Sequence, residues 1–64
     1  MVKINEMKKA VGHRARITFS DGSAEVTFVE AYQYEEDNDK EPFLEFTPNR
    51  ADYQSSIEKI DILD

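Results

Sequence analysis

The carboxylates between residues 35 and 41 are the first residues whose types and spacing could do chemistry. The stretch reads EEDNDKE, and Asp37, Asp39 and Glu41 alternate as the oxygen ligands of a Ca²⁺ loop do. Such a loop also needs glycine at its sixth position and a carboxylate at its twelfth, where this chain has Pro42 and Pro48. We therefore interpret the stretch as a solvated acidic loop. A Ca²⁺-responsive loop is the alternative, and a thermal shift on adding Ca²⁺ would test it.

The remaining polar residues do not form a catalytic set. His13 is the one histidine, and the sequence places no serine nucleophile beside it; there is no cysteine. We expect His13 to lie partly exposed where a helix meets a strand. The sequence thus predicts that the protein is not an enzyme and has no cofactor and no metal site.

Basic side chains near the start of the chain are the best candidate interaction site. Residues 1–20 have a net charge of +4, whereas residues 21–64 have a net charge of −10. This basic patch would bind an anionic partner, either an acidic protein surface, a second copy of the chain or an RNA backbone. The alternative is a solvated face whose long side chains cover the edge of the core. The patch consists of Lys3, Lys8, Lys9, Arg14 and Arg16.

A protein partner, or the chain itself, is favoured over RNA. Bases stack on exposed aromatic side chains, and RNA binding would need such side chains beside the basic patch. Tyr32 and Tyr34 instead lie next to the acidic stretch 35–41. No apolar run is long enough to span a membrane, so we expect no membrane partner and a cytoplasmic location.

The basic residues must be positioned by a short helix and the strand that follows it. Ile4, Met7 and Val11 form one apolar stripe at helical spacing, which predicts a helix over about 3–11. Asn5 or a residue just before it is expected to cap the helix. Gly12 is expected to end it in the left-handed conformation.

From His13 onward the apolar period is two, which predicts strands. Asp21-Gly22 between two such runs predicts a type I′ hairpin closed by Phe19 and Ala24. The second strand is long, and its apolar face changes midway, which indicates a bulge or sharp bend. A 3₁₀-like turn is expected around 54–56. The predicted strands are about 13–19, 24–34, 43–47, 52–54 and 57–63.

Together these elements predict one all-β domain over residues 1–64, a small five-stranded SH3-like or Sm-like barrel with a short N-terminal α-helix. At 64 residues the core is small, and self-association through edge strands is a plausible supplement to stability. The apolar pattern predicts a core made of Ile4, Met7, Val11, Ala15, Ile17, Phe19, Val26, Phe28, Val29, Leu44, Phe46, Ile57, Ile60 and Ile62.

The order of these elements resembles the Sm-like domain of Sm, LSm and Hfq proteins. Residues 11–19 (VGHRARITF) and Asp21-Gly22, followed by Val29 and Tyr32, stand where that family has its first motif, G-x-x-V-x-V-x-x-x-x-G…L-x-x-F. The tail 56–63 (SIEKIDIL) looks like the family's turn into its fifth strand. The resemblance implies the barrel, and a ring oligomer as a possible assembly.

The family's RNA-contacting residues do not carry over with the fold. The resemblance would place an Asp-x-x-x-Asn pattern after the aromatic residue, but this chain has Gln33 at the Asp position and Asp37 at the Asn position. The second family motif has no counterpart around Tyr53, and fold alone does not assign function. The sequence therefore predicts a non-enzymatic interaction module that self-associates or binds an acidic protein surface through the basic patch. The alternative is an Sm-like protein that contacts an RNA backbone through the same patch.

Overall fold

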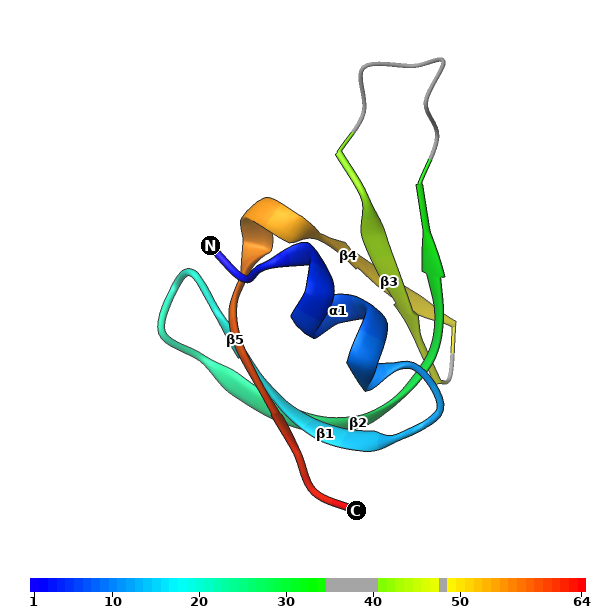
Figure 1. Ribbon diagram of the computed structural model, residues 1–64. Coiled ribbons are helices and arrows are strands. Elements are labelled where there is room, and N and C mark those ends of the chain that lie inside the picture. The colour runs from blue at the N-terminus through cyan, green and yellow to red at the C-terminus, as the bar shows by residue number, and fades with distance from the viewer. Residues whose placement is uncertain (35–40, 48) are drawn as a thin grey trace.

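The computed structural model describes residues 1–34, 41–47 and 49–64, which form one short helix and one antiparallel sheet (Figure 1). The sheet has five strands in the order β4-β3-β2-β1-β5. In its described residues no backbone pairing joins β4 to β5, so the sheet is open between them. The elements are α1 (Ile4–Ala10), β1 (Arg14–Phe19), β2 (Ala24–Gln33), β3 (Phe43–Phe46), β4 (Arg50–Tyr53), the 3₁₀ turn η2 (Gln54–Ser56) and β5 (Ile57–Ile62).

The long strand β2 belongs to both halves of the sheet. Its first half pairs with β1 and its second half pairs with β3. The register shifts between Val29 and Ala31, which confirms the irregularity that the change of apolar face indicated. Two hydrogen bonds hold the end of β3 beside the bend: Thr27 Oγ1 donates to the Thr47 carbonyl (3.0 Å), and the Thr47 N–H donates to the Phe28 carbonyl (3.1 Å).

The core lies between the inner face of the bent sheet and α1, which crosses it (Figure 1). Partly buried side chains pack against this core cluster, namely those of Val11, Phe19, Tyr32 and Ile60. Its fully buried apolar members come from the N-terminal segment, the helix and four of the strands. They are Val2, Met7, Ala10, Ala15, Ile17, Val29, Leu44, Phe46 and Ile57.

The prediction that Ile4, Val26, Phe28 and Ile62 are core residues is wrong, since each is between 40% and 50% exposed. On α1 the docked positions are Met7 and Ala10, three residues apart, and Ile4 lies at the margin of this contact.

In the half of β2 that pairs with β1, polar residues occupy the inward positions. Glu25 is opposite Ile17 in the register, and Thr27 is opposite Ala15, so both share the inner face. Val26 and Phe28 alternate with them and must therefore point outward. Ile62 lies opposite Ala15 at the last pair of the β1–β5 ladder, and its side chain remains 44% exposed.

The two ends of α1 differ in how they are fixed. Of the two alternatives for the cap, Asn5 is wrong: the N-cap residue is Lys3, two residues before it, and no side-chain hydrogen bond caps this end. Gly12 has φ +84°, the left-handed conformation predicted for it. Its N–H donates to the Val29 carbonyl (2.8 Å), and the Val29 N–H donates to the His13 carbonyl (3.0 Å). The helix is thus attached to the sheet at the bend in β2.

The β1–β2 turn also differs from its prediction. A type I′ turn needs positive φ at both central residues, but only Gly22 has it here (φ +92°). The Gly22 N–H donates to the Phe19 carbonyl (2.9 Å), and the Phe19 N–H donates to the Ser23 carbonyl (2.8 Å). The loop therefore has three residues and is closed by Phe19 and Ser23, the arrangement of a type I turn followed by a left-handed glycine.

Asp21 stabilises this turn as a charged acceptor. Its Oδ1 accepts from the Ser23 hydroxyl (2.6 Å) and from the Ser23 N–H (2.9 Å), and these two bonds hold the pKa of Asp21 below its ordinary value.

A lowered pKa in the folded state means that the ionised carboxylate contributes stability above the unfolded pKa. This contribution is lost as the pH falls through the folded pKa. Below pH 5, the free energy of unfolding of the wild-type protein should therefore fall more steeply than that of Asp21→Asn, in which this group does not titrate. Urea unfolding at several pH values measures the difference. Parallel curves would contradict the role assigned to Asp21.

Candidate interaction surface

The outer surface of β1 and β2 combines exposed apolar side chains with arginines. Arg14 is opposite Phe28 and Arg16 is opposite Val26, and all four alternate with inward-facing residues. Leu63 continues the β5 side, where its N–H donates to the Arg14 carbonyl (2.9 Å). Val26 is 50% exposed, Phe28 41% and Leu63 47%. We refer to these five residues as the outer β1–β2 face.

The charges around the outer β1–β2 face are mixed. Asp61 lies opposite Arg16, and the side chain of Asp64 accepts from the Arg14 backbone N–H (3.1 Å). Within the ranges that the structure describes, neither arginine side chain forms an ion pair. Both guanidinium groups are thus available to a partner's carboxylates, which they match in geometry.

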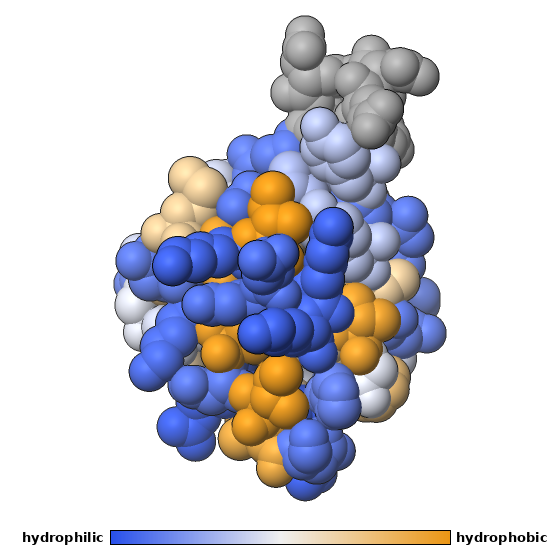
Figure 2. All heavy atoms as spheres, in the orientation of Figure 1, coloured by the Kyte–Doolittle hydropathy of each residue, from blue (hydrophilic) through white to orange (hydrophobic). Residues whose placement is uncertain are grey.

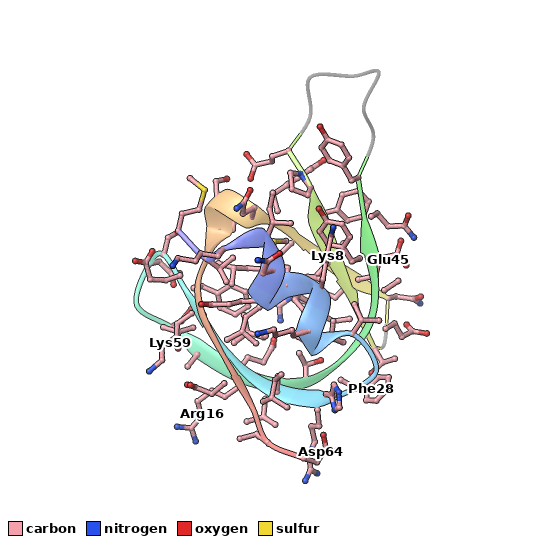
Figure 3. The ribbon with its side chains drawn as sticks, in the orientation of Figure 1. Lys8, Arg16, Phe28, Glu45, Lys59 and Asp64 are labelled. Atoms are coloured by element: carbon pink, nitrogen blue, oxygen red, sulfur yellow. The ribbon has the colours of Figure 1, made fainter. Side chains whose placement is uncertain are left out.

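The rest of the basic patch lies elsewhere on the molecule. Lys3 occupies the N-cap position of α1, and Lys8 and Lys9 are in its last turn. The Lys8 ammonium lies over the ring of Tyr32, 5.5 Å from its centroid. In Figure 3, Lys8 lies at the helix, whereas the side chain of Arg16 extends from β1 away from the helix. The sequence grouped five cations, and the structure brings together only Arg14 and Arg16.

The helix side of the molecule lacks a continuous apolar surface. In Figure 2 the apolar side chains on this side form separate patches among hydrophilic ones. The lysines of α1 therefore lie in an ordinary solvated surface. The arginines differ because they lie beside exposed aliphatic and aromatic groups.

Arg50 is a residue whose role the sequence reasoning missed. It belongs to β4, and its guanidinium forms an ion pair with Glu25 of β2. Its Nε lies 3.4 Å from Asp52 Oδ2, and the guanidinium carbon lies 5.2 Å from the centroid of the Phe19 ring. These contacts span the gap between β4 and the β1–β2 turn. The signal that could have found it is Glu25, an acidic residue at an inward-facing strand position that needs a cation nearby.

Two shallow pockets of about 250 Å³ flank Arg50. One is lined by residues from β2, β3 and β4, including Glu30 and Glu45, and the other by Phe19, Asp52 and the β1–β2 turn. In the described part of the chain, no three histidine or carboxylate side chains are grouped as metal ligands would be. The Arg50 guanidinium between the pockets is already paired with Glu25 and Asp52, so it is not free to bind an anionic ligand in either pocket.

The acidic stretch is described only at its end. Asp37 and Asp39 lie outside the described residues. Glu41 accepts a hydrogen bond from the Ser55 N–H (2.5 Å), and this bond lowers the pKa of the Glu41 carboxyl. Since the Gln54 N–H also donates to the Pro42 carbonyl (2.9 Å), Glu41 and Pro42 together anchor the start of β3 to η2. Glu41 thus has a structural contact that the sequence did not indicate.

His13 lies between α1 and β1, and its side chain is 46% exposed, in agreement with the sequence. Its Nδ1 is 3.6 Å from Asp64 Oδ1, which places the end of the chain beside the helix–strand junction.

None of the helices in the described ranges is long and apolar enough to cross a membrane. Comparison with known proteins adds no relative: no family, no curated protein and no solved structure matches this chain.

Proposed function

We propose that this protein is a small non-enzymatic interaction module that binds an acidic protein surface through the outer β1–β2 face. The observation that carries the proposal is the strand register, which sets Arg14 beside Phe28 and Arg16 beside Val26 on exposed positions. Aromatic residues and arginine are the residue types enriched where proteins bind one another.

The apolar residues supply most of the binding energy in this proposal. Full burial of one valine, leucine or phenylalanine side chain is worth about 1.5–3 kcal/mol, and roughly half of that remains for side chains already half-buried. Each exposed ion pair adds up to about 1 kcal/mol. The arginines instead select the partner, because they favour carboxylates over lysine-rich surfaces.

The net charge of −6 sets the range over which this selection works. At a distance, the whole chain repels an acidic partner. Screening limits that repulsion to about 8 Å at physiological salt. The arginines must therefore act at contact, where their own charge dominates.

A second candidate partner is single-stranded RNA, because Phe28 is an exposed aromatic side chain opposite Arg14. Bases stack on such side chains, and two arginines could contact phosphates. Asp61 and Asp64 beside the same arginines repel a backbone with a phosphate at every nucleotide more strongly than a protein surface with a few carboxylates, so we favour the protein partner.

The fold supports a related proposal, that the bent sheet is a small, incompletely closed barrel of Sm-like or SH3-like type. The strand order β4-β3-β2-β1-β5, the bent β2 shared by both halves and the single turn η2 before β5 are the features in its favour. Ring assembly and RNA contacts do not follow from this proposal.

The test compares charge reversal at two places. The probe is a fluorescent peptide of alternating glutamate and leucine, and binding is followed by anisotropy. Arg14→Glu combined with Arg16→Glu should weaken binding at least about tenfold, and Phe28→Ala should weaken it as well. The matched control, Lys8→Glu with Lys9→Glu, makes the same change of charge on α1 and should leave binding nearly unchanged.

The opposite pattern, with loss only in the lysine variant, would move the site to the helix. An oligouridine probe in the same assay addresses the second candidate. If the outer β1–β2 face binds RNA, the affinity for oligouridine should exceed that for the peptide and fall steeply with salt.

A further inference from the structure

β5 is an edge strand with a well-defined accessible stretch. In the described residues it pairs with β1 on one side, and the sheet order ends there. On the other side the Val2 N–H donates to the Ile57 carbonyl (2.9 Å), so the N-terminal segment occupies the start of this edge. The stretch left for another strand is 58–62, and its midpoint is Ile60.

The backbone of this stretch points its hydrogen-bonding groups outward at alternate residues. The Leu63 N–H donates to the Arg14 carbonyl of β1. In an antiparallel ladder, residues whose N–H and C=O groups point toward the partner strand alternate with residues whose groups point away from it. Asp61 and Lys59 therefore bond to β1, whereas the N–H and C=O groups of Ile60 and Ile62 point away from it. Two unpaired residues of this kind are a template for strand addition.

We propose that two copies of this chain pair antiparallel along β5, with the two-fold axis at Ile60. In this register Ile60 exchanges hydrogen bonds with Ile60 of the second copy. Lys59 of each copy then lies opposite Asp61 of the other, as a pair with closely spaced side chains. The side chains of Lys59 and Asp61 are 66% and 47% exposed, and within one copy Lys59 Nζ lies 3.7 Å from Asp61 Oδ2. The pairing therefore replaces the ion pair inside each copy, two in all, by two ion pairs between copies.

The same register brings exposed apolar side chains together. Ile62 of one copy lies opposite Glu58 of the other, and Glu58 Oε2 is 3.1 Å from the ammonium group of Met1. Met1 is 71% exposed and Ile62 44%. Pairing therefore places each Ile62 near the other copy's Met1, and both lose contact with water.

The other edge strand is less suited to such pairing. β4 has four residues, and its one cation, Arg50, is already bound by Glu25 and Asp52 and packed on Phe19. Drawing Arg50 into an interface would break these contacts. A contact between β4 and β5 of different copies would also be head-to-tail and give assemblies larger than a dimer. The β5 dimer does not depend on the outer β1–β2 face having a partner.

The test uses single and combined charge changes at positions 59 and 61. Lys59→Asp sets like charges opposite each other twice, and so does Asp61→Lys; each should weaken the dimer at least about tenfold by sedimentation equilibrium. The double variant with both changes should dimerise like the wild type. An equimolar mixture of the two single variants should form a heterodimer, detected by native mass spectrometry, because every facing pair is then opposite in charge.

Ile62→Pro tests the backbone part of the inference. It removes an N–H that points away from β1, so the chain should fold and remain monomeric. The control Phe28→Ala lies on β2, away from the edge, and should leave the dimer unchanged while weakening peptide binding. Three outcomes would overturn the inference: a wild type that is monomeric up to about 1 mM, assemblies larger than two, or a dimer that the charge variants do not weaken.

Discussion

Replacing Phe46 with alanine is expected to remove at least about a third of the protein's free energy of unfolding, whereas Phe28→Ala leaves most of it in place. Phe46 is 1% exposed, lies opposite Val29 at the bend of β2 and belongs to the one core cluster. Removal of a buried phenylalanine costs about 3–5 kcal/mol. At roughly 0.05–0.15 kcal/mol per residue, a chain of this length has about 3–10 kcal/mol in total. Urea unfolding followed by circular dichroism measures both variants.

The pair Phe46 and Phe28 makes a matched comparison, since the same atoms are removed from two faces of one sheet. Phe28 is 41% exposed, and we expect Phe28→Ala to cost about 1 kcal/mol or less. If Phe28→Ala destabilised the protein as much as Phe46→Ala, the outer β1–β2 face would be buried in solution. That result would contradict its role as an available surface.

The contrast between β1 and β2 shows how far local pattern predicts this fold. In β1 the apolar residues Ala15 and Ile17 alternate with Arg14 and Arg16, and the structure buries the first pair and exposes the second. In the half of β2 that pairs with β1, the more apolar residues, Val26 and Phe28, are the exposed ones. The inward-facing carboxylate of Glu25 is paired with Arg50, which lies 25 residues further along the chain. No local pattern could therefore reveal which face of β2 points toward the core.

The candidate site was predictable to a similar extent. Arg14 and Arg16 share a face because they are two residues apart on one strand, and period two requires it. The lysines of α1 are close in sequence, but their position depends on the angle at which Met7 and Ala10 dock on the sheet. That angle follows from tertiary packing. The exposed apolar neighbours of the arginines depend on the β1–β2 register, which the three-residue turn sets.

Replacing Met7 with aspartate is expected to unfold the whole protein and not only the helix. Met7 is fully buried, and its cluster includes Ala15, Ile17 and Leu44 of the sheet. An unpaired charge at this position costs several kcal/mol in addition to the lost packing, which is comparable with the total stability of the chain. Without α1 the inner face of the sheet would be exposed to water, and a chain this small has no second core to replace it.

The matched control is Ile4→Asp, one turn earlier on the same helix. Ile4 is 40% exposed, so its aspartate stays in water, and a carboxylate near the start of a helix interacts favourably with the helix dipole. We expect a change of about 1 kcal/mol or less, although the sequence pattern alone assigns Ile4 and Met7 to one buried stripe. Hydrogen exchange at the β1 amides distinguishes the alternatives for Met7→Asp. Loss of protection throughout β1 would show that helix and sheet unfold together. Retained protection would mean that α1 is a detachable cover over a sheet that is stable without it.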